Sequence, residues 1–324
     1  MTANLPNVLR GAAAVLMAVS AVTAHAQQPY PVKPVRVIVP FSPGGGTDLI
    51  ARLLAAKLSS VPGQQFVVEN RAGAGSTIGT EVALKSPADG YTLLVTGVTY
   101  TVSPNLYNLR YDPLADITPI IRADDGPFVM VVHPSLPARN VKQFVALAKS
   151  RPRQIAYATS GQGSITHLSS EWFSMLAGIK LVHVPYKGTG QSVVDTMAGH
   201  VQLTLAAVAS AVPHLKFGRL NAIAVTAPKR IAPLPDIPTL FESGFEIEVN
   251  NWHGMLGPRG LPQSVVDKLN ADINAIIKEP EFAQRIAAEG LIPAGGNPER
   301  LLTLIKTELA NWARVVKQTG LKAD

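Results

Sequence analysis

The chain has 324 residues, of which 47% are hydrophobic and 16% are charged, a composition typical of a folded globular protein rather than a disordered one. It contains no cysteine, which excludes disulfides, thiolate catalysis and metal sites with cysteine ligands. The net charge is +7, but the basic residues are scattered rather than interleaved with aromatic residues in a stripe, so the sequence favours attraction of small anions over nucleic-acid binding.

The first 26 residues have the features of a secretory signal peptide. Arg10 precedes an apolar stretch, residues 11–22, which is shorter than the roughly 20 residues of a membrane-spanning helix. Ala24 and Ala26 then provide the small residues that a signal peptidase reads. We expect cleavage after Ala26 and export of the mature chain to the periplasm, the alternative being an uncleaved membrane anchor.

Strands alternate with helices in the first part of the mature chain. The apolar runs are nearly continuous, as expected for strands covered on both faces of a sheet. The order strand–helix–strand predicts parallel pairing with right-handed crossovers. The expected strands are residues 35–41, 65–70 and 91–97, and the expected helices are residues 49–58 and 77–86.

The same alternation begins again after a connection at residues 127–137, and residues 250–258 lead back. Two connections between two α/β units predict a hinge, with a ligand cleft between two lobes. We expect lobe I to comprise residues 27–125 plus 247–324, and lobe II residues 126–246. The expected elements of this part are helices 141–150 and 191–198, strands 155–160, 181–186, 201–208 and 221–227, and C-terminal helices 262–278, 280–289 and 298–317, which pack on lobe I.

Three consecutive glycines separate the first strand from its helix, in the loop from Ser42 to Thr47. Ligands of open α/β sheets bind at the carboxyl ends of the strands, where this loop lies. Glycine lets the backbone approach a ligand closely, and the following helix N-terminus offers unpaired N–H groups to an anion. The alternative is that the glycines only permit a tight turn. Asp48 complements the helix dipole but repels an anion, unless a ligand ammonium meets it.

A second loop, residues 160–167, repeats the order of strand, glycines, hydroxyl side chains and helix. We expect the two loops to face each other across the cleft. Two helix N-termini at one cavity suit a ligand with two separated negative groups, such as a dicarboxylate. The candidate ligand-binding residues are Ser42, Pro43, Gly44, Gly45, Gly46, Thr47, Asp48, Ser76, Thr99, Ser160, Gly161, Gly163, Ser164, His167, Tyr186 and Val208.

Other chemistry has weaker support in the sequence. Ser164 and His167 raise the alternative of an exported hydrolase, but no orienting acid is near in sequence and no G-x-S-x-G motif occurs. Residues 73–79 resemble a loosened dinucleotide fingerprint with the wrong spacing, so we expect no nicotinamide site. The histidines show no metal-ligand spacing, and we expect neither a metal nor a cofactor.

Several segments, taken in chain order, carry a family resemblance: "PFSPGGGTDLIAR", "GQQFVVENRAGAGSTIG", "SPADGYTLLV", "PNLYNLRYDPLADITPI", "YATSGQGSITHLSSEWF", "VHVPYKGTG", "AIAVTAPKRIAPLPDIPTLFESG" and "LPQSVVDKLN". They cover nearly the whole mature chain. The sequence resembles the Bug family, periplasmic solute-binding receptors of tripartite tricarboxylate transporters. The resemblance implies a two-lobed α/β periplasmic-binding-protein fold (Venus flytrap, type II) with two crossover segments, and no enzymatic activity.

The resemblance also implies that backbone amides, hydroxyls and waters of the two loops grip a small carboxylate, an amino acid or a nicotinic-type acid. It further implies integral membrane permease subunits as partners. Residues 97–103 and 250–262 depart from the family pattern and leave the ligand's identity open. A receptor that delivers a small organic anion to a permease is therefore the leading interpretation. A ligand-presenting sensor is a further alternative, and we expect a monomer.

Overall fold

The computed structural model describes residues 30–60, 65–288 and 290–322. Contacts divide the chain into a unit of residues 1–32 and a second unit of residues 33–324, whose fold is described below. The expected signal peptide lies outside the described residues. Within the described ranges, no helix combines the length and the hydropathy needed to cross a membrane.

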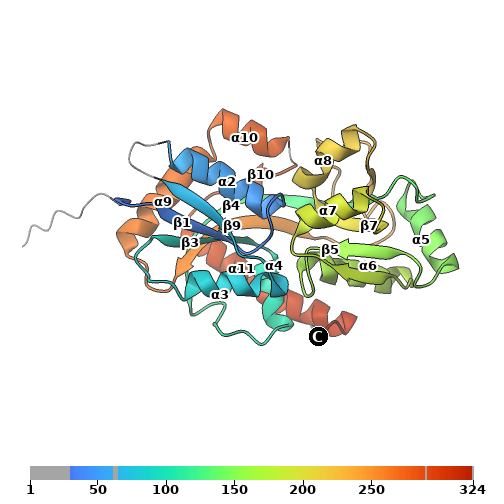
Figure 1. Ribbon diagram of the computed structural model, residues 1–324, viewed down its shortest axis with the longest axis horizontal. Helices are drawn as coiled ribbons and strands as arrows, with labels where there is room; N and C mark the ends of the chain where they lie inside the picture. Colours follow the sequence, from blue (N-terminus) through green and yellow to red (C-terminus); the bar gives the residue numbers. More distant parts are fainter. Residues whose placement is uncertain (1–29, 61–64, 289, 323–324) are drawn as a thin grey trace, which may run out of the picture. The chain divides into compact units, whose positions relative to one another are not determined.

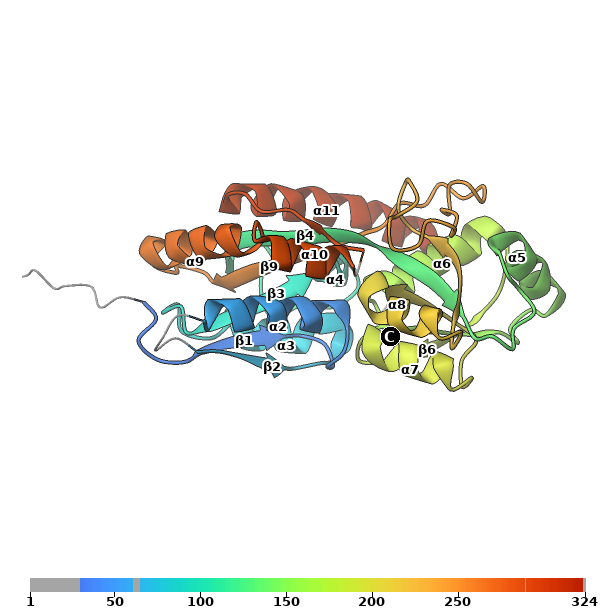
Figure 2. The ribbon, with the colours of Figure 1, turned by 90° about the horizontal axis from the view of Figure 1, so that it is seen from above.

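Three parallel strands form the first part of the sheet, in the order β2-β1-β3. Figure 1 labels β1 and β3, and Figure 2 labels all three strands. They are β1 (Val35–Val39), β2 (Phe66–Asn70) and β3 (Thr92–Gly97), and the parallel pairing predicted from the sequence is confirmed. Helices α2 (Gly46–Leu58) and α3 (Thr77–Leu84) connect them. Helix α2 begins three residues earlier than expected, because the last glycine of the loop already belongs to its first turn.

A long strand that the sequence did not reveal, β4 (Ile117–Val132), takes part in both halves of the sheet. Its beginning pairs antiparallel with β9 (Asn250–Pro258), which also pairs with β3. Its end pairs with β7 (Leu203–Ala207) and β8 (Asn221–Val225). Prolines and charged residues hide the strand in the sequence, and two shifts of register against β9 accommodate them. Figure 2 shows β4 running from the orange and blue elements to the yellow and green ones.

The second half of the sheet has β5 (Ala156–Thr159) between β6 (Val182–Pro185) and β7, all parallel. Around it lie α5 (Val141–Ser150), α6 (Ile165–Ala177), α7 (Thr189–Met197) and α8 (Val208–Lys216). The expected strand 201–208 was wrong at its end, because Val208 is the first residue of α8. An unbroken apolar run from strand to helix contains no periodicity that marks the boundary.

The C-terminal part returns to the first half of the sheet. It consists of α9 (Gln263–Ile276), α10 (Pro280–Ala287), the short β10 (Ile292–Pro293) and α11 (Pro298–Thr319). Helix α11 contacts β4 and α6, as well as the short α4 (Thr99–Val102). Two further single-turn helices are η1 (Ala74–Ser76) and η2 (Ser103–Asn105).

The protein therefore has a two-lobed α/β fold. One lobe is built on β2-β1-β3-β9-β4 and the other on β4-β7-β5-β6 with β8. Strand β4 belongs to both halves of the sheet and joins them. The residue boundaries expected for the two lobes stay a prediction.

Candidate ligand-binding site

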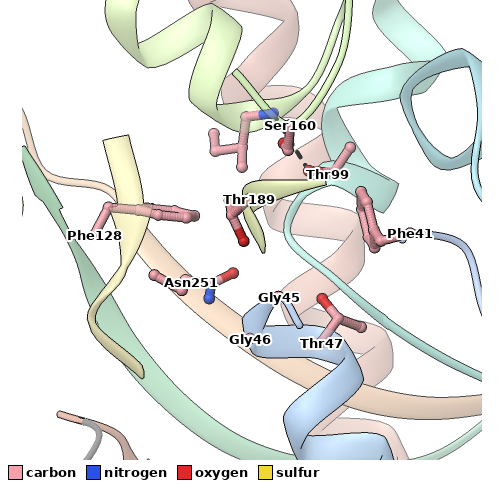
Figure 3. Close-up of a pocket in the computed structure, with 11 residues that line it drawn as sticks. Phe41, Gly45, Gly46, Thr47, Thr99, Phe128, Ser160, Thr189 and Asn251 are labelled. Atoms are coloured by element: carbon pink, nitrogen blue, oxygen red, sulfur yellow. Dashed lines mark hydrogen bonds between the residues drawn. The ribbon is translucent and has the colours of Figure 1, made fainter. Parts of the chain in front are cut away.

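A small cavity lies where the carboxyl ends of β1, β3, β5 and β7 come together (Figure 3). Its volume is ≈ 30 Å³, on a scale where about 10–15 Å³ holds one water molecule. None of its lining side chains is ionisable. The lining residues are Phe41, Gly45, Gly46, Thr47, Thr99, Phe128, Ser160, Ile165, Thr189, Ala207 and Asn251.

The first glycine loop lines this cavity with the N-terminus of α2. Gly45 is the N-cap of α2, with extended backbone, and its carbonyl accepts the first helical hydrogen bond from Leu49 N at 3.0 Å. The amides of Gly46, Thr47 and Asp48 therefore have no acceptor within the helix. They lie at the positive end of the helix dipole, which stabilises a negative charge.

Asp48 lies in the same turn but does not line the cavity. Its Oδ2 accepts hydrogen bonds from Gly44 N and Arg52 Nε, both at 3.0 Å, and its Oδ1 accepts one from Asn70 Nδ2 at 2.9 Å. Burial alone would raise the pKa of Asp48, but these hydrogen bonds outweigh it and hold the pKa below its ordinary value. The carboxylate braces the loop, and both oxygens already have donors.

The second loop is built differently, because its own side chains occupy most of its amides. Ser160 N donates to Thr166 Oγ1 at 2.8 Å, and Gly163 N donates to His167 Nδ1 at 3.1 Å. His167 N in turn donates to Ser164 Oγ, which caps α6. Only Ser160 of the candidates in this loop lines the cavity, while Gly163, Ser164 and His167 are buried behind it and hold the loop in shape.

Beneath this loop, the imidazole rings of His167 and His183 stack with their centroids 3.7 Å apart. Burial lowers the pKa of His167 to about 3 and that of His183 to about 4, so both rings are neutral at pH 7. Because the His167 ring is neutral, its Nδ1 has a lone pair that accepts the hydrogen bond from Gly163 N. That lone pair is then not available to a serine hydroxyl. Among the described residues, Ser164 Oγ contacts Thr166 and a backbone amide rather than a histidine ring. That arrangement does not support the alternative of a serine–histidine hydrolase.

The first loop also contacts α7 and α8, which belong to the second half of the sheet. Ser42 N donates to Lys187 O at 2.8 Å, and Ser210 Oγ donates to Gly44 O at 3.2 Å. The approach is close enough that a Cβ on Gly190 would lie 2.8 Å from the Pro43 carbonyl oxygen. Ser42, Pro43 and Gly44 thus join the two halves next to the cavity rather than line it.

The remaining predicted residues lie around the cavity. Ser76, Gly161 and Tyr186 line a neighbouring pocket of ≈ 230 Å³, which shares Phe41 and Ser160 with the cavity. Tyr186 donates its hydroxyl hydrogen to Asp195 Oδ2 at 2.7 Å. Val208 packs toward Gly290 and does not line the cavity, whereas the preceding Ala207 does.

Sequence reasoning missed several lining residues. Thr189 had a usable signal, because it follows a strand and a glycine and begins a helix, just as the two recognised loops do. The apolar lining residues look like ordinary core residues in the sequence, and the strand that carries Asn251 could not be oriented. The missed residues are Phe41, Phe128, Ile165, Thr189, Ala207 and Asn251.

Comparisons with known proteins identify the family. The model of the tripartite tricarboxylate transporter family receptor matches residues 50–321. The chain belongs to this receptor family. BugT of Bordetella pertussis is similar to it, with 36% identity over 297 residues, which are 90% of this chain and 91% of BugT. The resemblance to Bug proteins is thus confirmed, and the family consists of transporter receptors rather than enzymes.

Two solved structures share the fold of this receptor. A protein of R. palustris solved with adipate is 35% identical with a TM-score of 0.87, and the match covers 90% of this chain and 99% of that one. MatC from Rhodopseudomonas palustris with bound malate is 30% identical with a TM-score of 0.85, and the match covers 89% of this chain and 100% of that one. Both relatives hold a small dicarboxylic acid, and this receptor has a solute-binding role.

Proposed function

We propose that this receptor captures a small organic anion, a carboxylate, amino acid or dicarboxylate, between its lobes at the place that the cavity marks. The ≈ 30 Å³ of the cavity is smaller than such an anion, so the lobes must separate to admit it. The observation that carries the proposal is that Gly46 and Thr47, whose amides have no acceptor in the helix, line a space that ionisable side chains do not line. A carboxylate oxygen there receives amide hydrogen bonds and the favourable field of α2 without a counter-ion that must be desolvated.

Hydroxyl groups on the opposite wall complete the proposed site. Thr99, Ser160 and Thr189 come from three different elements and line the same cavity (Figure 3). A hydroxyl donates as well as accepts, so these groups can bind a second carboxylate. The dicarboxylates held by the two solved relatives support this ligand class.

We further propose that the mature receptor works in the periplasm after cleavage behind Ala26, and that it passes its ligand to membrane permease subunits. The family's description as a transporter receptor supports this role. Ligand binding that favours contact between the lobes would provide the signal for docking, because a ligand shifts a conformational equilibrium only through different affinities for its two states.

Thermal and chemical unfolding of the mature protein with mono- and dicarboxylates and amino acids tests the proposal. A true ligand at about 100 times its dissociation constant adds ~2.7 kcal/mol to the free energy of unfolding. The variant Gly45→Val should lose this gain, because a Cβ at this position lies 3.0 Å from Thr189 Oγ1 and the branched side chain fills the cavity. Its backbone conformation, φ −87° and ψ 170°, is open to valine, so the fold should persist.

Ala56→Val is the matched control, since it adds valine to an exposed position of the same helix. It should keep the full ligand-induced stabilisation. Equal stabilisation of Gly45→Val and the parent would contradict the assignment of the loop, and stabilisation by none of these acids would contradict the proposed ligand class.

A further inference from the structure

The floor of the cavity is formed by Asn251, behind which two buried ionisable residues form a chain of hydrogen bonds. Asn251 Nδ2 lies 3.3 Å from His253 Nε2, and His253 Nδ1 lies 2.7 Å from Asp124 Oδ1. The side chains of His253 and Asp124 are 0% and 1% exposed. Neither lines the cavity, so Asn251 is the member of this chain that can meet a ligand.

The contacts favour one arrangement of the hydrogen atoms along the hydrogen-bonded series Asn251–His253–Asp124. Burial raises the pKa of Asp124 from its ordinary value, and the contact with His253 opposes that rise. When Asp124 is ionised its oxygens only accept hydrogen bonds, and His253 then donates from Nδ1. Nε2 then carries the lone pair. Gly46, the first residue of α2, adjoins this nitrogen, since a Cβ there would be 3.4 Å from Nε2. A lone pair is the favourable partner for the positive end of the helix dipole.

With His253 Nε2 as acceptor, Asn251 must donate to it through Nδ2. The position of the carbonyl oxygen, Oδ1, at the other side of the amide is then fixed. Figure 3 shows the amide directed into the cavity, with its oxygen on the side of Thr189. Among the described residues no donor to Asn251 Oδ1 is found. The floor of the cavity therefore presents a carbonyl oxygen, which accepts a hydrogen bond and repels a carboxylate.

We infer that Asn251 is a specificity-determining residue, whose Oδ1 accepts a hydrogen bond from a hydroxyl or ammonium group of the ligand. The receptor should then prefer a hydroxy- or amino-substituted carboxylic acid to the unsubstituted acid of equal length. His253 and Asp124 are positioning residues that act through the orientation of the Asn251 amide. This inference rests on the proposed function of the cavity.

The preference has a physical basis in the cost of an unpaired group. An unsubstituted acid that closes the cavity removes water from Asn251 Oδ1 and supplies no donor in its place. Sites built to hydrogen-bond a substrate group discriminate against the analogue that lacks it. We expect at least about tenfold weaker binding of the unsubstituted acid.

Isothermal titration of the mature receptor with matched acids tests this preference. The pairs are malate or aspartate against succinate, 2-hydroxyglutarate or glutamate against glutarate, and 2-aminoadipate against adipate. The comparison is made among the acids with the number of carbon atoms that binds most tightly. There, a hydroxy- or amino-substituted acid should bind at least about tenfold more tightly than the unsubstituted acid. Equal affinities within that set would overturn the inference and leave the proposed function intact. Absence of binding by all these acids would overturn the inference for dicarboxylic acids and would restrict the proposed function to acids with one carboxyl group.

Variants then assign the preference to Asn251. Asn251→Leu keeps a similar volume without the amide and should bring the affinity ratio close to one. Asn250→Leu is the control, because Asn250 is an exposed neighbour on the same strand, and it should keep the parental ratio. An unchanged ratio in Asn251→Leu would exclude Asn251 as the source of the preference.

The positioning role has its own spectroscopic signature. Nitrogen-15 chemical shifts of the His253 ring, assigned by their loss in His253→Gln, should show the neutral tautomer with hydrogen on Nδ1 in the free and ligand-bound receptor. The tautomer is read in the parent protein, and the variant serves only to assign the signals. Hydrogen on Nε2, or on both nitrogens, would reverse the Asn251 amide and overturn the inference.

Discussion

The two glycine-containing loops follow the same local plan, yet they make opposite use of their backbone amides. In the loop that precedes α2, the amides of Gly46 and Thr47 stay free, and the carboxylate of Asp48 accepts from Gly44 N instead. In the loop that precedes α6, Thr166 Oγ1 accepts a hydrogen bond from Ser160 N, and His167 Nδ1 accepts one from Gly163 N. A strand, a glycine turn and a helix can therefore offer amides to an anion only where the side chains of the turn leave those amides unoccupied.

The difference predicts that glycines of the two loops fail in different ways when they are substituted. Gly163→Ala should lower the free energy of unfolding by about 2–4 kcal/mol, since it adds left-handed strain and overpacking. Gly163 has φ 66°, and a Cβ there would lie 2.6 Å from Tyr107 Cε2. Urea unfolding measures the loss.

Gly178→Ala separates strain from crowding, because Gly178 has φ 62° with no atom within 4 Å of its Cβ position. It should cost about 1 kcal/mol. A Gly163→Ala variant as stable as Gly178→Ala would show that the second loop is not tightly packed. The contrast between the loops would then disappear, because Gly45→Val is expected to lose ligand binding rather than stability.

Acid should weaken the second loop through its buried histidines. The pKa of His167 is about 3 in the folded protein, and its ordinary value of 6.5 applies to the unfolded chain. Between these pH values the unfolded chain binds a proton at His167 that the folded protein does not bind. This histidine's contribution is complete above pH 6.5 and falls as the pH drops toward 3.

His167→Asn can accept the Gly163 amide but does not titrate. Its stability deficit relative to the parent should therefore shrink by about 2 kcal/mol between pH 7 and pH 5. Chemical unfolding at several pH values checks this expectation. A deficit that is constant over the range would mean that His167 is not held neutral in the folded protein.

The first loop should respond to acid over a different range. Hydrogen bonds hold the pKa of Asp48 below 3.8 despite burial, so its stabilisation is present above that value and is lost as the pH falls through the lowered pKa. Asp48→Asn should cost about 1–2 kcal/mol at pH 7. The cost should shrink only below about pH 4, which unfolding curves at pH 3 to 7 would reveal. A cost that vanished already at pH 6 would contradict the brace formed with Arg52 and Asn70.

Local pattern was sufficient to predict much of this receptor. Nearly continuous apolar runs that alternate with helical patterns predicted the parallel strands β1, β2 and β3. They also placed both glycine loops after strands. Those features depend on residues a few positions apart, through side-chain periodicity and helix termini. The family resemblance also came from the sequence, because its segments extend along nearly the whole mature chain.

The tertiary structure alone decided what lies at the cavity. Asn251 reaches it because β9 pairs between β3 and β4, and Thr189 reaches it because α7 packs against the first loop. Whether the Gly163 amide is free depends on a histidine ring kept neutral by burial, a state that only the packed protein creates. The sequence determined where backbone amides begin a helix, and the folded chain decided which amides remain unpaired, because hydrogen-bond partners and desolvation come from residues distant in sequence.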